Sequence, residues 1–269
     1  GEREKAEPAA VAVEMLHNFT LLHDDIMDCS PLRRGKPTVF RKYNQNKAIL
    51  SGDAMFACAF KYLLQCDKEV IPQLTETLTR GAIEVCEGQG FDMDFENRQT
   101  VSTDEYLQMI KLKTGVLLST ALRLGAITAK ADEKTLNLLD TFGKYIGIAF
   151  QIKDDMLDCW SDLDTFGKVC GADIIDRKKT FLYITALESA TQTQRQELLS
   201  LYENTTLDKD EKIQKVRAIY EQLSVAQKAQ KAVEEYNSKA FEALEQIDVA
   251  PQRKATLIEV AKKLINRNK

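Results

Sequence analysis

The chain has 269 residues, of which 44% are hydrophobic and 29% charged, and its formal net charge is −4. Only 12 Gly and 5 Pro are present, which argues against an all-β sandwich, because such folds need turn residues at short intervals. The negative charge argues against a general nucleic-acid-binding surface. A membrane span is not expected, because no run of about 18 apolar residues occurs. The 6 cysteines are scattered without a Cys-x-x-Cys pair, which indicates reduced, mostly buried thiols in a soluble cytoplasmic protein.

Hydrophobic periodicity predicts helices along most of the chain. Apolar residues recur at steps of three and four from Ala9 to Asp28, where neither Gly nor Pro interrupts them. A capping box at Ser102–Glu105 predicts the start of another helix. Phe142–Cys159 has the same periodicity, as does the stripe from Val225 to Ile247, after which Pro251 marks a break.

No stretch alternates apolar and polar residues well enough to predict a sheet. Gly143 and Gly147 lie one helical turn apart, so a neighbouring helix is expected to approach closely there. The longest stretch without a clear pattern is Ser161–Lys179, which is rich in Asp, Gly and Lys. The sequence therefore predicts a single all-α domain.

Two acidic clusters share the spacing Asp-Asp-x-x-Asp, and each follows an apolar run near the C-terminal end of a predicted helix. Residues four apart lie on one helix face, where like charges repel each other, and the negative end of the helix dipole adds to that cost. One such cluster could be a solvated acidic face, but two with the same spacing favour a cation site. Carboxylate oxygens suit Mg²⁺ or Mn²⁺, and Mg²⁺ commonly binds one or two carboxylates together with substrate phosphates. The residues are Asp24, Asp25 and Asp28 in the first cluster and Asp154, Asp155 and Asp158 in the second.

Basic residues follow both acidic clusters. Arg33 and Arg34 come soon after the first cluster, and Lys168 and Lys178 come after the second, while Lys113 lies within a predicted helix. Each alone is more often a surface charge, but together they resemble a clamp for a diphosphate, whose oxygens Arg and Lys bind. A neutralised diphosphate is a good leaving group, and the arrangement suits ionisation of an allylic diphosphate beside an apolar pocket.

The residues resemble the trans-isoprenyl (polyprenyl) diphosphate synthases of the short-chain type. The resemblance runs from about Ala9 to the end of the chain and rests on several motifs in the family's order. These are Leu22–Asp28 with Arg33–Gly35, Gly88–Gly90, Lys113-Thr114, Phe150–Asp158, Gly167-Lys168, and Lys178-x-Thr180.

This resemblance implies an all-α helical bundle around a central cavity, and a prenyltransferase that condenses isopentenyl diphosphate head-to-tail with allylic diphosphates. Mg²⁺ would be bound by Asp24, Asp28 and Asp154, with Asp25, Asp155 and Asp158 in support. The allylic diphosphate would be held by Arg33, Lys113, Gln151, Lys168 and Lys178. Thr114 would lie beside the forming cation, and Arg34 would contact isopentenyl diphosphate. The family is usually homodimeric, which makes a homodimer the expected assembly.

One part of the family pattern is missing from the chain. An upstream Gly-Lys-x-Arg segment and a later His, which bind isopentenyl diphosphate in the family, have no counterpart before Ala9. Residues 1–269 are therefore expected to form one synthase domain that lacks its N-terminal helices, and that half of the isopentenyl diphosphate site stays unassigned.

Product length is expected to depend on residues one turn before the first acidic cluster. Thr20 lies almost beneath Asp24 on the helix, and Phe19 lies to one side. Phe19 could be ordinary core packing, but an aromatic here resembles enzymes that make short products. Geranylgeranyl diphosphate (C20) is the expected product and farnesyl diphosphate (C15) the alternative. A class I terpene cyclase and a non-catalytic regulatory subunit are less favoured, because both Asp motifs are intact.

Overall fold

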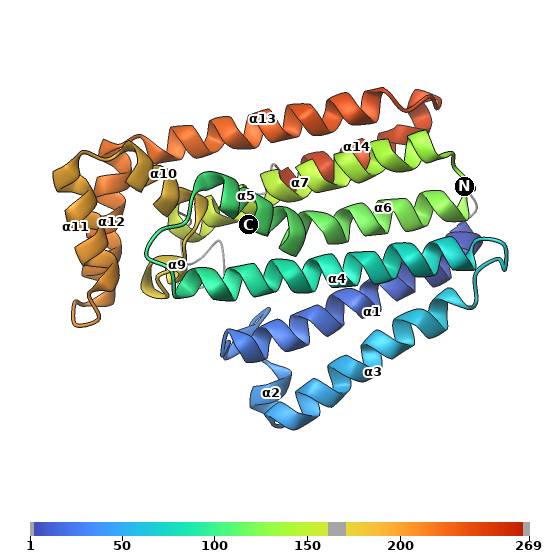
Figure 1. Ribbon diagram of the computed structural model, residues 1–269, viewed down its shortest axis with the longest axis horizontal. Coiled ribbons are helices and arrows are strands. Elements are labelled where there is room, and N and C mark those ends of the chain that lie inside the picture. Colours follow the sequence, from blue (N-terminus) through green and yellow to red (C-terminus); the bar gives the residue numbers. More distant parts are fainter. Residues whose placement is uncertain (1–2, 161–170, 266–269) are drawn as a thin grey trace.

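The computed structural model describes residues 3–160 and 171–265, and almost all regular structure in these ranges is helical (Figure 1). The first half contains α1 (Arg3–Met27), the two-residue strands β1 (Leu32–Arg33) and β2 (Lys36–Pro37), α2 (Val39–Lys42), α3 (Gln45–Leu63), α4 (Ile71–Glu96), α5 (Thr103–Ile110), the π-helical turn η1 (Lys111–Gly115) and α6 (Val116–Thr128). The second half contains α7 (Glu133–Trp160), α9 (Ala172–Ile175), α10 (Phe181–Ser189), α11 (Gln192–Glu203), α12 (Lys209–Gln222), α13 (Val225–Glu245) and α14 (Pro251–Ile265).

The long helices run alongside one another in a bundle. Helix α6 packs against α1, α4 and α7, while α3 covers the other side of α1 and α13 covers α7. The shorter helices α9–α12 gather at one end of the bundle (Figure 1). The carboxyl ends of α1 and α7 point toward this end, so the bundle brings the two acidic clusters to the same region of the molecule.

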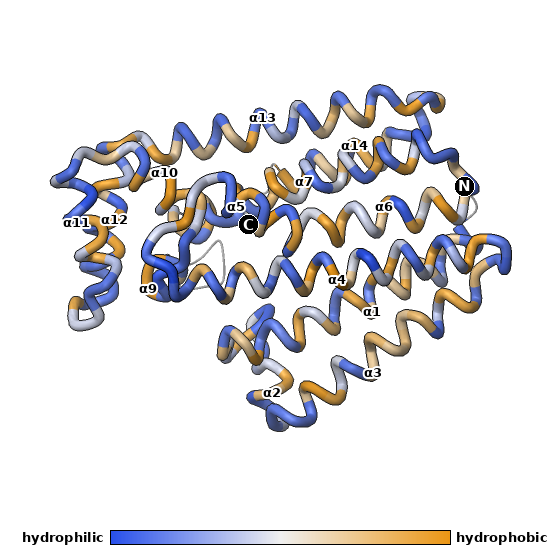
Figure 2. Tube along the Cα trace, in the orientation of Figure 1, coloured by the Kyte–Doolittle hydropathy of each residue, from blue (hydrophilic) through white to orange (hydrophobic). Residues whose placement is uncertain are grey.

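Two large hydrophobic clusters stabilise the bundle. One lies among α1, α3, α4 and α6 and includes Leu16, Leu63, Leu78 and Leu124. The other extends from α5 through α7 to the C-terminal helices. Helix α13 shows why such helices fold against a neighbour, because hydrophobic and hydrophilic residues alternate around it with helical periodicity (Figure 2).

The structure confirms the predicted helices. The first extends six residues further back than expected, to Arg3, and the Phe142–Cys159 segment is the second half of α7. The capping box is present, with Ser102 and Glu105 each bonding the other's backbone. The stripe from Val225 forms α13, and Pro251 starts α14 after the break.

A hairpin after α1 was not predicted, and part of the segment after α7, for which no element was predicted, is helical. A small antiparallel hairpin pairs Arg33 with Lys36, and its turn residues Arg34 and Gly35 both have positive φ, as a type I′ turn requires. The sequence did not predict it, because strands of two residues leave no periodic pattern. In the segment after α7, residues 161–170 lie outside the described residues, and the remainder contains the short helix α9.

Close helix contact at Gly143 and Gly147 is confirmed. A Cβ atom at Gly147 would lie 2.3 Å from Gly115 Cα, and one at Gly143 would lie 2.6 Å from Ser119 Cα. Real Cβ atoms do not approach this closely, so α7 reaches η1 and α6 only because these positions lack side chains. The contact holds η1 against α7.

The cysteine prediction is confirmed only in part. The five cysteines in the described ranges are all free, and Cys66 and Cys159 are buried. Cys29 and Cys86 are exposed, so the expectation of mostly buried thiols is wrong. None of the helices described is long and apolar enough to cross a membrane.

Candidate active site

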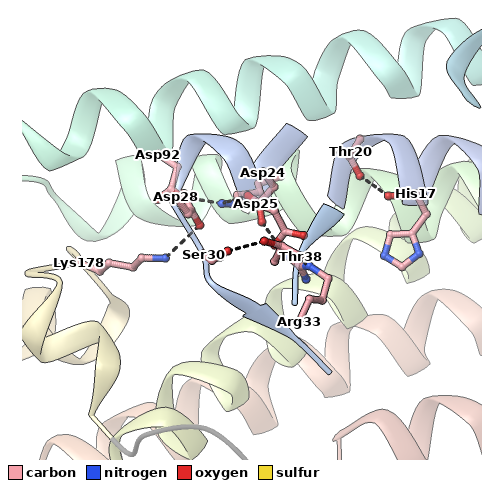
Figure 3. A network of polar contacts seen from close by, with 11 residues as sticks. His17, Thr20, Asp24, Asp25, Asp28, Ser30, Arg33, Thr38, Asp92 and Lys178 are labelled. Atoms are coloured by element: carbon pink, nitrogen blue, oxygen red, sulfur yellow. Dashed lines mark hydrogen bonds and ion pairs between the residues drawn. The ribbon is translucent and has the colours of Figure 1, made fainter. Parts of the chain in front are cut away.

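The first acidic cluster lies where α1 ends and the chain turns back on itself. The Asp25 carbonyl accepts from Ser30 N, the Ile26 carbonyl accepts from Cys29 N, and Cys29 has φ 51°, which together form a Schellman motif. Thr38 then donates to the Ser30 carbonyl at 2.8 Å, which fixes the hairpin beneath the helix end. This local fold places the hairpin's Arg33 against the aspartates of α1 (Figure 3).

Arg33 bridges the first two aspartates. Its Nε donates to Asp25 Oδ1 at 2.8 Å, and its Nη2 donates to Asp24 Oδ2 at 3.1 Å. Asp25 is only 5% exposed. Burial raises the pKa of Asp25, although the Arg33 guanidinium opposes the shift. Asp25 therefore faces the protein and is held by Arg33.

Two lysines from distant parts of the chain reach the same cluster. Lys113 Nζ, from η1, lies 3.4 Å from Asp24 Oδ1 and 2.6 Å from Asp92 Oδ2. Lys178 Nζ, from the segment before α10, lies 3.7 Å from Asp28 Oδ2 (Figure 3). The tertiary structure thus gathers cations from the middle and the C-terminal half of the chain around the aspartates of α1.

Negative charge still exceeds what these lysines neutralise. Burial raises the pKa of Asp28, and Asp24 raises it further, despite Lys178 and Lys113. Burial alone would lower the pKa of Lys178, but the surrounding carboxylates, Asp173 first among them, raise it on balance. The pKa of Lys113 is raised in the same way. Such a surplus of carboxylate charge is what a bound cation would relieve.

The second acidic cluster, on α7, has a different environment. Asp155 is 4% exposed, and its Oδ2 accepts from Tyr106 Oη at 2.5 Å and from Phe181 N at 3.0 Å. Its Oδ1 accepts from Gln151 Nε2 at 3.3 Å. Burial raises the pKa of Asp155 to about 7, because these neutral donors offset only part of the desolvation. Asp158 Oδ2 accepts from Asp173 N at 3.1 Å.

Lys113 and Thr114 stand on the π-helical turn η1. π-Turns inside α-helices are rare and often occur at functional sites. Close packing surrounds this turn, because a Cβ at Gly88 would lie 2.3 Å from Lys113 N. Thr114 Oγ1 donates to Gln151 Oε1 at 3.0 Å, so two of the predicted site residues are in contact.

Two acidic residues of this site, Asp92 and Asp173, were not predicted from the sequence. Asp92, on α4, pairs with Lys113, and it follows Gln89 of the Gly88–Gly90 motif by three residues, which places both near one helix face. Asp173, on α9, is half-buried, and the pKa of its carboxyl is raised well above the ordinary value by desolvation and by Asp158. No spacing pattern in the sequence could have identified Asp173.

The remaining predicted residues lie apart from this network or outside the description. Arg34 is exposed at the hairpin turn, and Lys168 lies outside the described residues. Phe19 packs against His23 and Phe56, with ring centroids 4.7 and 5.1 Å apart, so it faces α3. Thr20 donates to the carbonyl of residue 17, on the turn before the aspartates (Figure 3).

The donor set fits a hard divalent cation bound together with substrate. Within the described ranges, no group of three or more His, Cys, Asp or Glu side chains is arranged to hold a metal unaided. Asp24 Oδ1 is nevertheless buried and accepts no hydrogen bond, although the Lys113 ammonium lies 3.4 Å away as an ion-pair partner. Mg²⁺ suits this situation, because it usually takes one or two carboxylates and completes its shell with water and phosphate.

Carboxylates of α1 and lysines from distant parts of the chain are thus gathered at one end of an all-helical bundle. Residues 1–223 match the family model described as polyprenyl synthetase, and the chain belongs to this family. It is 43% identical over 211 residues to a short chain isoprenyl diphosphate synthase from Methanocaldococcus jannaschii, a match that covers 78% of this chain and 64% of the relative.

Two further comparisons agree in fold and family. The chain is 38% identical over 266 residues to a geranylgeranyl pyrophosphate synthase from Geoglobus acetivorans, covering 98% of this chain and 81% of that protein. A crystal structure of a geranylgeranyl pyrophosphate synthase superposes with a TM-score of 0.95 at 43% identity, over 100% of this chain and 83% of the other. The all-α isoprenoid synthase fold expected from the resemblance is therefore confirmed.

Proposed function

We propose that the protein is a Mg²⁺-dependent prenyltransferase that condenses isopentenyl diphosphate with allylic diphosphates to make geranylgeranyl diphosphate. The observation that carries the proposal is the convergence of Lys113 and Lys178 on Asp24 and Asp28 of the first Asp motif. Carboxylates and lysines that lie close together at one end of the bundle suit the binding of a diphosphate through a divalent cation. Similarity to synthases of this class supports the same conclusion.

In this proposal Asp24, Asp28 and Asp154 would hold Mg²⁺, which when bound would supply positive charge to neutralise a leaving diphosphate. Mn²⁺ would suit the same oxygen ligands. Asp25, Asp155 and Asp158 act in support by holding the polypeptide around them, as their hydrogen bonds indicate.

The basic residues bind the substrates. Arg33, Lys113 and Lys178 hold the allylic diphosphate, together with Lys168, and Arg34 contacts isopentenyl diphosphate. Before substrate binds, Arg33 and Lys113 are paired with Asp24, so they are held in position for an incoming diphosphate. Gln151 also holds the allylic diphosphate, and Thr114 lies beside the forming cation and stabilises its positive charge through its oxygen atom.

The C20 product is favoured over farnesyl diphosphate. One of the geranylgeranyl pyrophosphate synthases compared above shares the fold over the whole chain, and the other is similar in sequence over 98% of the chain. Phe19, an aromatic side chain five residues before Asp24, is the residue proposed to limit the product.

We further propose a homodimer in the cytoplasm. Leu50 on α3 and Leu64, the residue just after α3, are each 67% exposed, and Ile83 on α4 is 55% exposed, so this region presents apolar side chains that a second copy could cover. The free thiols of the described cysteines suit a reducing compartment. Light scattering after gel filtration would test the dimer, and a monomer at micromolar concentration would contradict it.

The activity is tested by incubating the protein with Mg²⁺, labelled isopentenyl diphosphate and, separately, C5, C10 and C15 allylic diphosphates. Products are dephosphorylated and separated by chain length. A ladder that stops at C20 is expected, and one that stops at C15 would favour the farnesyl product. Release of diphosphate without elongation would contradict the proposed reaction, and a chelator control would test the need for metal.

A further inference from the structure

Tyr106 is a buried tyrosine that connects α5 with the second Asp motif. Its side chain is 2% exposed and its hydroxyl donates to Asp155 Oδ2 at 2.5 Å. The same oxygen accepts from Phe181 N, the first amide of α10. Asp155 thus joins three helices that are far apart in sequence, and Tyr106 supplies the only side-chain hydroxyl in the described contacts of this carboxylate.

A chain of hydrogen bonds continues from Asp155 to residues proposed to face the substrate. Gln151 Nε2 donates to Asp155 Oδ1 at 3.3 Å, and Gln151 Oε1 accepts from Thr114 Oγ1 at 3.0 Å. Thr114 stands on η1, which continues directly from α5, the helix that carries Tyr106. The hydrogen bonds and the backbone therefore form a closed ring through Tyr106, Asp155, Gln151 and Thr114.

The polarity of this ring is determined by its acidic member. Gln151 turns its NH₂ toward Asp155 Oδ1, so its carbonyl oxygen is the atom that faces Thr114. Thr114 then donates its hydroxyl proton to Gln151, so the lone pairs of its oxygen remain able to accept from, or face, another group. Oxygen lone pairs are what a developing positive charge attracts, so the orientation of this ring matters to the proposed chemistry.

We infer that Tyr106 is a positioning residue, which fixes Asp155 and through it the orientation of Gln151 and Thr114. The inference rests on the proposed function for its catalytic consequence, but the orientation of Gln151 is a property of the free protein. Removal of the hydroxyl leaves Asp155 Oδ2 with Phe181 N alone, so the carboxylate can rotate and Gln151 loses a fixed partner.

The first test observes Gln151 directly and needs no activity. The protein is labelled with ¹⁵N-glutamine, and the Gln151 side-chain amide signal is identified by its disappearance in Gln151→Ala. Tyr106→Phe should shift this signal and speed exchange of its protons. Tyr202→Phe is the matched control, because Tyr202 is also 2% exposed and also loses a hydroxyl hydrogen bond, here to Tyr220 Oη at 2.8 Å. An unmoved Gln151 signal in Tyr106→Phe would overturn the inference whatever the activity.

The second test is a double-mutant cycle on turnover. Tyr106→Phe should lower kcat about tenfold, because small misplacement of reacting groups is costly. Its Kd for an unreactive allylic thiolodiphosphate should stay within about threefold of the wild type, and Tyr202→Phe should change kcat less than about twofold. In the Gln151→Ala background, Tyr106→Phe should have almost no further effect. Equal losses for the two Tyr→Phe variants, or additive effects in the cycle, would contradict the inference.

An inactive wild-type protein and an unfolded Tyr106→Phe variant are two further outcomes, and each leaves the inference testable. If the wild-type protein elongates no allylic diphosphate, the proposed function fails, and the amide signal still decides whether Tyr106 orients Gln151. If circular dichroism shows that Tyr106→Phe is unfolded at the measuring temperature, Asp155→Asn replaces it, because an amide cannot accept on both sides. An unmoved Gln151 signal in that variant would overturn the inference equally.

Discussion

The two Asp-Asp-x-x-Asp motifs have the same sequence spacing, but their surroundings differ. In the first motif the partners are cations, with Arg33 on Asp24 and Asp25, Lys113 on Asp24, and Lys178 on Asp28. In the second motif the partners described for Asp155 are neutral donors. The first motif is therefore balanced by charge, whereas the described partners of Asp155 in the second motif are neutral hydrogen-bond donors.

The middle aspartates of the two motifs, Asp25 and Asp155, show the difference in partners most clearly. Asp25 and Asp155 are both buried, and the protein itself occupies their oxygens. Both were predicted to support metal binding, and in the structure each holds a loop or helix end in place beside its outer neighbours. Identical spacing thus does not mean identical electrostatics, because the partners come from elsewhere in the chain.

The largest expected effect is loss of the outer aspartates. Asp24→Asn and Asp154→Asn should each lower kcat by roughly 10²–10³, because each removes charge that would hold the metal against the leaving group. Steady-state assays at saturating Mg²⁺ measure the loss, with Asp53→Asn, an exposed residue on α3, as the control. If only one of the two variants loses activity, the two motifs do not share the chemistry.

The next effect concerns how α7 is held against η1. Gly147→Ala should lower the free energy of unfolding by about 1–3 kcal/mol, because its Cβ would lie 2.3 Å from Gly115 Cα. Gly125→Ala on α6 is the matched control, since nothing lies within 4 Å of its added Cβ, and it should stabilise the helix by about 0.5–1 kcal/mol. Urea unfolding measures both, and equal effects would mean that the close contact does not exist.

The pH dependence of stability should distinguish the two middle aspartates. Asp155 has a folded-state pKa of about 7 against an ordinary value of 3.8, so the folded protein holds the extra proton between these values. Its contribution to stability therefore falls as pH rises from about 4 to about 7. Asp155→Asn removes this loss. The difference in Tm between the variant and the wild type, measured on metal-free protein, should therefore shift in favour of the variant by about 2–4 °C as the pH is raised from 4.5 to 7.5.

Asp25→Asn is the comparison for that experiment. The pKa of Asp25 is also raised by burial, but Arg33 opposes the shift, so the improvement with pH should be smaller. Differential scanning calorimetry in EDTA measures both variants across the pH range. An improvement for Asp25→Asn that equals or exceeds that for Asp155→Asn would contradict the contrast between charged and neutral partners.

The smallest effect on rate is expected at the aromatic residues before each motif. Phe19→Ala should lengthen the product beyond C20 with little loss of total turnover, because it removes a ring that packs against Phe56 one turn before Asp24. Phe150→Ala, four residues before Asp154 in the second motif, should leave product length unchanged. Chromatography of the dephosphorylated products measures both, and an unchanged distribution in Phe19→Ala would remove Phe19 from the account.

Local information was enough to predict several parts of the molecule. The long apolar periodicity of α1, α7 and α13, the capping box at Ser102 and the close approach at Gly147 depend on neighbouring residues or on the absence of a side chain. The two Asp motifs were also visible, because carboxylates four apart at a helix end are costly unless something compensates them. These features follow from helical geometry alone.

The partners of those aspartates were decided only by the tertiary structure. Nothing local places Lys178 beside Asp28, Tyr106 beside Asp155 or Asp92 beside Lys113, because each pair is joined by helix packing across many intervening residues. Burial is likewise a property of the packed bundle, and it is burial that raises the pKa of Asp155. The sequence by itself determined where the acidic motifs lie on their helices. Packing of the helices determined which carboxylate oxygens are bonded by other residues of the protein.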